Sequence, residues 1–322
     1  MELRAFAALR SASDLERNPT QLLADEPHPR FVPEHQNNEE LPTTSSVPSE
    51  VPEKQGQLFR DVLRVFEESK LPYAVSGAFA LRQHTGICRF TKDLDLFVTG
   101  TSLPCALAQL RKLDFECEIQ DPVWLAKVHR DDYFVDLITG MSNGVISVED
   151  SWIRRAQPAV IYGIETRVLA PEELVASKLF VARRERFDGA DITHIIYGTN
   201  GSFDWNREME LVGEHWEILL WALLLFRYAY PGQSHYVPRK IWRELLRRFD
   251  NAVMHPDPAA PFRGSLVDDC MFAIDVNEWG LPNLLEAGRE RRLAELDAMA
   301  RCANDAADHE VKYVAAESEE KP

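Results

Sequence analysis

Hydrophobic residues recur at helical spacing near residue 55 and in short alternating runs after it. Leu58, Val62 and Phe66 share one face of a helix if residues 55–70 are helical. Leu71-Pro72 should end that helix, because the residue before a proline avoids helical backbone angles. The same kind of pattern predicts strands at 73–75, 94–98, 115–119 and 133–138, helices at 78–85 and 102–112, and a hairpin at 158–169 that turns near Gly163.

From Pro171 onward the hydrophobic spacing becomes helical. Proline suits the first position of a helix, where its missing N–H costs nothing. Helices are predicted at 171–186, 189–197, 207–229, 238–250 and 282–301. The chain therefore divides into an α/β (α+β) domain at 55–200, with a sheet flanked by helices, and an all-helical region at 205–301.

The two ends of the chain have a different composition. Residues 1–54 are rich in Pro, Glu, Ser and Asn and contain few apolar residues, so they predict a disordered N-terminal arm. Residues 302–322 predict a polar C-terminal tail on the same grounds.

Composition limits the class of protein. A net charge of −16 argues against a broad nonspecific nucleic-acid surface, although it leaves room for a local basic patch. No apolar run reaches the about 18 residues of a membrane span, and the first residues lack the apolar core of a signal peptide. Five scattered cysteines without a Cys-x-x-Cys spacing give little support to a zinc site or a disulfide framework. We therefore expect a cytoplasmic protein with no membrane association.

A pair of aspartates stands in one of the predicted strands. Side chains alternate along a strand, so Asp93 and Asp95 project from one face while Leu94 points to the other. Two neighbouring carboxylates repel each other, and burial makes the repulsion stronger. A divalent cation relieves it, and Mg²⁺ prefers such oxygen ligands. On its own, however, the pattern is also common in turns and exposed strands.

A third acid, Asp136, lies inside the apolar run YFVDLI. Charged residues are seldom tolerated there without a partner. If this strand neighbours the first, Asp136 completes a metal-binding triad or takes the proton of an attacking hydroxyl. An edge-strand acid or a buried ion pair is the simpler explanation for Asp136 alone.

The turn Ser76-Gly77 precedes the acid pair and opens a helix. Ser76 is a favourable N-cap residue, and Gly77 lets the backbone approach a phosphate closely. Free N–H groups at a helix N-terminus bind phosphate, so the turn is a candidate triphosphate cradle. A capped helix after a strand explains the same residues without a ligand.

Together these features resemble a known superfamily. The order of strand, small-Gly turn, helix, Thr91-x-Asp93-x-Asp95 and a lone strand aspartate resembles the DNA polymerase beta-like nucleotidyltransferases. The strings AVSGAFALRQHTGICRFTKDLDLFV and PEELVASKLFVARRERFDGADITHII look like the minimal bacterial branch, which includes toxin–antitoxin nucleotidyltransferases. The resemblance covers residues 73–197. It departs from the family at Ser76-Gly77, where Gly-Ser or Gly-Gly is usual.

The resemblance implies a mixed sheet, an NTP substrate, Mg²⁺ and a possible protein partner of the toxin–antitoxin type. It implies that Asp93, Asp95 and Asp136 hold the metal and are catalytic. The nucleotide-binding residues would be Ser76, Gly77, Arg89, Thr91, Lys178 and Arg184. A surface lysine with its stem packed down is the plainer explanation for Lys178. One of the nearby arginines should pair with Asp188 or Asp191, and Asp188 should cap the following helix.

The implied reaction transfers NMP from NTP to an acceptor hydroxyl and releases pyrophosphate. The acceptor stays open between a small molecule such as an aminoglycoside-like alcohol, a protein hydroxyl and an RNA end. A noncatalytic nucleotide-binding or antitoxin-like module is the alternative, and three retained acids count against it. Residues 200–245 are rich in Trp and Tyr, which indicates either a helical core or a stacking platform for a base.

Overall fold

The computed structural model describes residues 52–299 and residue 301. The predicted arm therefore lies outside the described residues except for 52–54, and the predicted tail at 302–322 lies outside them entirely. Helix α1, Glu53–Glu68, begins two residues before the predicted start. Among the residues that the structure describes, no helix is both long and apolar enough to cross a membrane.

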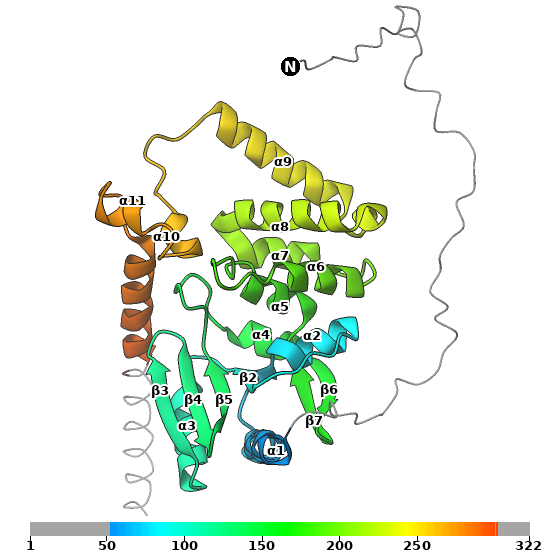
Figure 1. Ribbon diagram of the computed structural model, residues 1–322, viewed down its shortest axis with the longest axis vertical. Helices are drawn as coiled ribbons and strands as arrows, with labels where there is room; N and C mark the ends of the chain where they lie inside the picture. Colours follow the sequence, from blue (N-terminus) through cyan, green and yellow to red (C-terminus); the bar gives the residue numbers. More distant parts are fainter. Residues whose placement is uncertain (1–51, 300, 302–322) are drawn as a thin grey trace, which may run out of the picture. The chain divides into compact units, whose positions relative to one another are not determined.

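The centre of the protein is a seven-stranded mixed sheet (Figure 1), which confirms the predicted fold class. The strand order is β3-β4-β5-β2-β1-β7-β6. β2 pairs with β5 in parallel and β1 with β7 in parallel, whereas the other neighbours are antiparallel. The strands are β1 Ala74–Val75, β2 Asp93–Phe97, β3 Glu116–Asp121, β4 Leu125–Arg130, β5 Tyr133–Ile138, β6 Gln157–Ile161 and β7 Ile164–Val168.

One strand was absent from the sequence prediction. In β4, LAKVHR, the polar residues Lys127 and His129 interrupt the apolar pattern. Both are partly buried, because alternate side chains of β4 point to the sheet face that carries Asp136. The predicted hairpin forms as β6 and β7, with Tyr162 and Gly163 both at positive φ in its two-residue turn.

Two helices cover the other face of the sheet. α1 packs against β5 and β7, and α3, Leu103–Lys112, packs against β3 and α1. The inward side chains of the central strands, such as Leu94, Leu96 and Val135, are completely buried there. Burial of these aliphatic side chains is the main force that holds the sheet to the helices, at about 1.5–3 kcal/mol for each of them.

The helix after Pro171 is much shorter than predicted. α5 spans Pro171–Lys178, not 171–186. The chain then doubles back, because the Asp188 N–H donates to the Val181 carbonyl at 2.9 Å and Ala182 pairs with Phe187 in an isolated bridge. The run Arg-Arg-Glu-Arg offers no apolar residue to continue the buried face of α5, so the segment forms a loop instead.

The remaining helices are mostly where the sequence places them. The predicted helix 207–229 is two helices, since Gly213, with φ +50°, begins a 3₁₀ turn η2, Gly213–His215, between them. Residues 284–299 are helical, within the predicted 282–301. Short α4, α10 and α11 were not predicted. The bounds are α2 Gly77–Thr85, α4 Asp150–Arg155, α6 Gly189–Gly198, α7 Trp205–Val212, α8 Trp216–Ala229, η3 Pro231–Tyr236, α9 Arg239–Met254, α10 Gly264–Val267 and α11 Ala273–Asn277.

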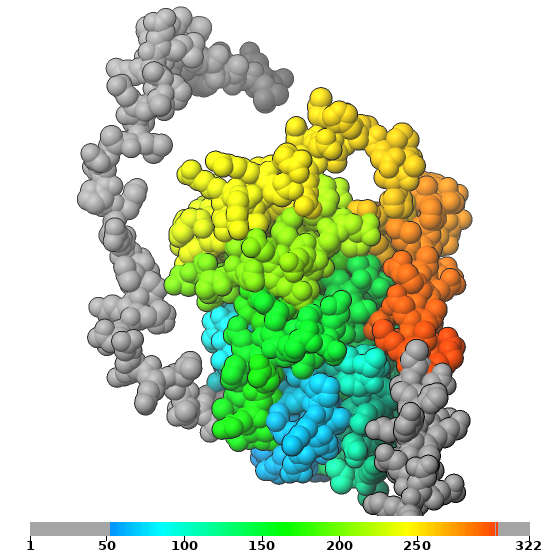
Figure 2. All heavy atoms as spheres, turned by 180° about the vertical axis from the view of Figure 1, so that it is seen from behind, coloured from blue at the N-terminus to red at the C-terminus, as the bar shows by residue number. Residues whose placement is uncertain are grey.

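The C-terminal helix at 284–299 is anchored to the sheet side of the molecule. Arg289 forms an ion pair with Asp121 at 3.0 Å and donates to the Ser142 carbonyl at 2.8 Å. Figure 2 shows this segment, orange to red, lying along the teal strands. The core residues of the sheet and of the helical part form one connected cluster. The division near residue 200 therefore stays a prediction.

Candidate active site

The parallel pairing of β2 with β5 brings the acids together. In this register Asp95 lies directly opposite Asp136, and Asp93 lies two residues earlier on the same face. One carboxylate oxygen from each of the three lies within 4.8 Å of the other two. The structure thus places Asp93, Asp95 and Asp136 in one cluster, near the N-terminal end of β2.

The cluster carries an electrostatic conflict. Burial, together with the charges of Asp93 and Asp136, raises the pKa of Asp95 to about 7. Burial also raises the pKa of Asp136, against the opposing effect of a bonded lysine. Like charges at this spacing destabilise one another unless a cation lies between them. The donor set fits Mg²⁺, a hard cation that takes carboxylate oxygens and keeps several ligands from water or phosphate.

Gly77 is required where α2 meets the cluster. Its φ is +57°, and a Cβ built there would lie 1.8 Å from Oδ2 of Asp95. Ser76 is almost completely buried, and its N–H donates to the Asp95 carbonyl at 2.9 Å. Ser76 occupies the N-cap position, but its side chain forms no capping hydrogen bond, contrary to the expectation from sequence. The start of α2 is therefore fitted to the carboxylate of Asp95.

Thr91 and Arg89 each bind the carboxylate of an aspartate in or near the site. The Thr91 hydroxyl donates to Oδ1 of Asp93 at 2.8 Å, so it orients that carboxylate. The Arg89 guanidinium forms an ion pair with Asp191 at 2.5 Å. The predicted contact of both residues with nucleotide stays a prediction, and in this structure their polar groups bind aspartates.

Lys178 is a buried lysine with two acidic partners. Its ammonium lies 2.8 Å from Asp188 and 2.9 Å from Asp191, and only 8% of the residue is exposed. The explanation as a surface lysine is therefore wrong. These ion pairs join the end of α5 to the start of α6. The two aspartates already neutralise the Lys178 ammonium, for which the sequence predicted a contact with phosphate. Asp188 stands at the N-cap of α6 without capping it, because its carboxylate is used by Lys178.

The arginine near the acids is Arg186. Its guanidinium donates to both carboxylate oxygens of Asp188, and this bond, with the charges of Asp95 and Asp93, raises its pKa further. Arg184, the residue selected from the sequence, is exposed, and its backbone N–H donates to Asp268. No feature of the sequence distinguishes Arg186 from Arg183 and Arg184. The conformation of the loop brings Arg186 toward the acids, and that conformation depends on tertiary contacts.

Lys127 is a site residue that the sequence prediction missed. Its ammonium lies 2.6 Å from Oδ1 of Asp136 and 3.7 Å from the centre of the Phe134 ring. β4 and β5 pair so that Lys127 stands directly opposite Asp136. The sequence signal that could have revealed this residue was a lysine at an alternate position of β4, a strand that the sequence analysis did not predict. Burial raises the pKa of Asp136, and the ion pair with Lys127 opposes that rise.

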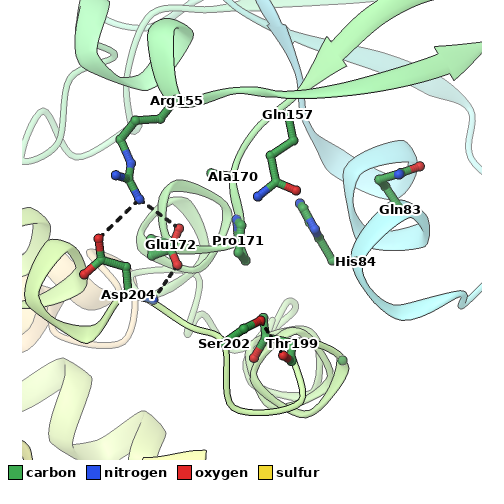
Figure 3. A pocket seen from close by; sticks show the side chains of 11 residues that line it. Gln83, His84, Arg155, Gln157, Ala170, Pro171, Glu172, Thr199, Ser202 and Asp204 are labelled. Carbon is green, nitrogen blue, oxygen red and sulfur yellow. Dashed lines mark hydrogen bonds and ion pairs between the residues drawn. The ribbon is translucent and has the colours of Figure 1, made fainter.

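A polar cavity of about 550 Å³ lies at the other end of α2 (Figure 3). Arg155 forms ion pairs there with Glu172 and Asp204, while Gln157 and His84 point toward one another. Gln83 and His84, the α2 residues that line this cavity, follow Gly77 by six and seven positions, which is about 9–10 Å along the helix at 1.5 Å per residue. The cavity is thus distinct from the aspartate cluster.

The structure describes one further group with metal-ligand spacing, formed by Asp268, Asp269 and Cys270. Asp268 already accepts the backbone N–H groups of Arg184 and Met271. Its carboxylate therefore holds local structure. The cysteines in the described residues are free thiols, as the sequence suggests: Cys88, Cys105, Cys117 and Cys270.

Comparison with known proteins gives a family match. Residues 56–215 match the family described as "Nucleotidyl transferase of unknown function". No curated protein matches the chain. This segment contains the whole aspartate cluster, Gly77 and Arg186.

Several solved structures share a limited likeness. They include the antibiotic-resistance factor ANT(2'')-Ia, at 17% identity over 57% of this chain and 96% of that one, with a TM-score of 0.32. An antigenic nucleotidyltransferase-like protein from Paracoccidioides brasiliensis is 19% identical over 58% of this chain and 93% of that one, with a TM-score of 0.39. JHP933 from Helicobacter pylori is 15% identical over 82% and 97%, with a TM-score of 0.31.

The match to the family agrees with the superfamily resemblance seen in the sequence, and it covers the strands and helices that build the site. Through residues 56–215, this chain belongs to the nucleotidyltransferases.

Proposed function

We propose that this protein transfers a nucleoside monophosphate from an NTP to an acceptor hydroxyl, with Mg²⁺ held by Asp93, Asp95 and Asp136. The observation that carries the proposal is the meeting of three carboxylates within 4.8 Å on paired strands. A purely structural site has no use for three acids at this spacing, because their mutual repulsion destabilises the fold.

In this reaction the acceptor oxygen bonds to the α-phosphorus, and the bond from that phosphorus to the leaving oxygen breaks. Pyrophosphate leaves, and the hydroxyl proton passes to Asp136 or to solvent. When bound, Mg²⁺ would neutralise phosphate charge and polarise the transferred group. Thr91 orients Asp93 for this purpose, and the ion pair with Lys127 orients Asp136.

Phosphate binding is assigned to the start of α2 and to Arg186. Gly77 puts the N-terminus of α2 against Asp95, where free N–H groups attract an anion beside the metal ligands. The Arg186 side chain is largely exposed and lies near Asp93 and Asp95, so it is available to a triphosphate. Lys178 acts by positioning, since its two aspartate partners connect it to Arg186 and Arg89.

The alternative is a noncatalytic nucleotide-binding or antitoxin-like module. One observation favours it: Lys127 neutralises Asp136 without any metal. Asp93 and Asp95 receive no such lysine in the part of the chain that the structure describes, and Asp95 keeps a strongly raised pKa of about 7. We favour the metal-dependent enzyme because a bound cation would relieve this remaining repulsion between carboxylates.

The test uses the purified full chain. Each α-³²P-labelled NTP is incubated with Mg²⁺ and a cell extract, and label is sought on RNA, protein and small molecules. Asp93→Asn and Asp95→Asn should lower transfer at least about 100-fold, the scale on which loss of one preorganised charge contact slows an enzyme. Asp150→Asn, an exposed acid at the start of α4, is the matched control and should leave transfer unchanged.

Calorimetry of Mg²⁺-dependent NTP binding separates the two hypotheses. Binding without transfer to any acceptor class supports the noncatalytic module. The proposal fails if wild type neither transfers label nor binds NTP in a manner that Mg²⁺ and Asp95 control.

A further inference from the structure

Helix α8 carries an exposed apolar stripe. Trp221, Leu224 and Tyr228 are 46%, 51% and 85% exposed, and their spacing of three and four residues puts them on one face of the helix. Phe187, itself 53% exposed, stacks on Trp221 with ring centres 5.7 Å apart. Phe187 follows Arg186, the arginine whose pKa the charges of Asp95 and Asp93 help to raise, so one chain segment contributes both to the stripe and to the proposed nucleotide site.

The stripe leads to a cavity of about 500 Å³ between α8, η3 and α9. Its apolar lining comes from Leu224, the buried Val237 and the half-buried Trp242. Exposed Arg227, His235 and Arg239 line the same cavity. This lining combines an aromatic surface with positive charge. Figure 1 shows α8 and α9 packed side by side at one end of the helical part.

The two arginines of the cavity are not used by the fold. Within residues 52–299, neither Arg227 nor Arg239 has an ion pair, whereas Arg247 and Arg248 on α9 share Glu244. Residues 216–254 contain six Lys and Arg but three Asp and Glu, in a chain whose net charge is −16. A local basic surface is therefore present on an acidic protein.

We propose that the acceptor is the end of a single-stranded nucleic acid that lies along α8, with its phosphates on Arg227 and Arg239. This inference rests on the proposed nucleotidyl transfer and names the acceptor class for it. Bases would stack on the exposed rings of Trp221 and Tyr228 and in the cavity on Trp242. Proteins bind single strands through this combination of aromatic rings and cations, and every base offers a face for stacking.

The charges distinguish this acceptor from others. A protein docked on the apolar stripe would bury the guanidinium groups of Arg227 and Arg239, which have no acid partner among the described residues. Their burial is costly unless the docked protein supplies a matching acid. A cationic small molecule would be repelled by them. A phosphate backbone satisfies both arginines, and its bases cover the apolar rings.

Direct binding tests the surface. Fluorescence anisotropy measures binding of a labelled single-stranded RNA oligonucleotide, and of its DNA counterpart, to the full chain at several salt concentrations. Arg227→Ala/Arg239→Ala should weaken binding at least tenfold. Loss of two phosphate contacts should also lower the slope of log K against log salt by about 1.4, at about 0.7 for each phosphate of a single strand. Tyr228→Ser should weaken binding at least fivefold, since each stacked base is worth about 1–3 kcal/mol.

Arg247→Ala is the matched control, because it removes the same charge from α9 at an arginine already paired with Glu244 outside the cavity. It should change oligonucleotide binding less than twofold. The altered side chains of the test variants are exposed, and circular dichroism verifies their folding. In transfer assays the double variant should raise KM for the oligonucleotide and leave NTP binding unchanged.

Failure of this inference is distinct from failure of the proposed function. If the oligonucleotides do not bind, or bind wild type and the double variant equally, the surface is not a nucleic-acid site. Label found only on a protein or a small molecule overturns it as well. Loss of Mg²⁺-dependent NTP binding in wild type would instead overturn the nucleotidyl transfer itself.

Discussion

At the scale of single residues, a few contacts around the three carboxylates determine the geometry of the site. Gly77 is the clearest, since any side chain there meets the carboxylate of Asp95. Thr91 and Lys127 each orient one carboxylate, at 2.8 Å and 2.6 Å. Together they hold three acids in a geometry that the acids alone would not adopt.

Gly77→Ala should disrupt the site. The new Cβ would lie 1.8 Å from Asp95 Oδ2 at a φ of +57°, so either the helix start or the carboxylate must move. We expect a loss of nucleotidyl transfer of at least about 100-fold, comparable to loss of one catalytic charge contact. Gly232→Ala, at a position with open space around it, should retain activity. Equal activity of both variants would show that the α2 start plays no part in the reaction.

Lys127→Met should destabilise the metal-free protein. It removes the partner of Asp136 and leaves a largely buried carboxylate unpaired, which should lower the free energy of unfolding by about 1–3 kcal/mol. Urea unfolding in EDTA measures this. Lys54→Met breaks an exposed ion pair with Asp131 and should change stability by less than about 1 kcal/mol. A loss no larger than that of Lys54→Met would mean that Asp136 is solvated.

At the scale of elements, the strand pairings and the loop after α5 decide what the site contains. The sequence indicated strands β2 and β5 and the three acids on them, but alternation alone says nothing about which strands are neighbours. It missed β4 because Lys127 and His129 break the apolar pattern, and with β4 it missed the lysine on Asp136. It extended α5 through the arginines, and so could not single out Arg186.

The contact between α5 and α7 makes stability depend on pH. Glu208 on α7 is completely buried, and neither carboxylate oxygen has a hydrogen-bond partner. Burial, with the charges of Glu172 and Glu173, raises its pKa well above the usual value. A raised folded-state pKa means that the folded state binds the proton more tightly. The stabilisation is therefore complete below pH about 4, near the unfolded-state pKa, and is lost as the pH rises toward the folded-state pKa.

Glu208→Gln tests this directly. The amide cannot ionise, so the variant should gain stability relative to wild type as the pH rises from 4 to 8. Urea unfolding at both pH values provides the measurement. Glu210→Gln, at an exposed position on the same helix, should show no comparable trend. A constant difference between wild type and Glu208→Gln across this range would contradict the assigned pKa shift.

At the scale of the whole molecule, core packing joins the sheet to the helical part. Leu58 of α1, Leu96 of β2 and Phe226 of α8 belong to one connected cluster. The helix at 284–299 returns to the sheet side through Arg289 and Asp121. A ligand that stabilises the site should therefore raise the stability of the folded chain.

Mg²⁺ should raise the melting temperature of the chain. A ligand that binds only the folded state stabilises it by about 2.7 kcal/mol at 100 times its Kd. We expect the effect to be reversed by EDTA and to be absent in Asp95→Asn, which loses one ligand and the charge conflict. Asp150→Asn should keep the full Mg²⁺ shift. A shift of the same size in Asp95→Asn would place Mg²⁺ elsewhere on the protein.

The sequence by itself determined most of the element types, the three aspartates, the Ser76-Gly77 turn and the superfamily. These follow from local rules, because side-chain alternation, turn preference and the rarity of a charge in an apolar strand act over a few residues. Only the tertiary structure decided which acids lie opposite one another and that Lys178 forms ion pairs with Asp188 and Asp191. It alone also decided that Lys127 and Arg186 lie near the aspartate cluster. Those relations join residues far apart in the chain, and strand register and packing, not local pattern, determine such contacts.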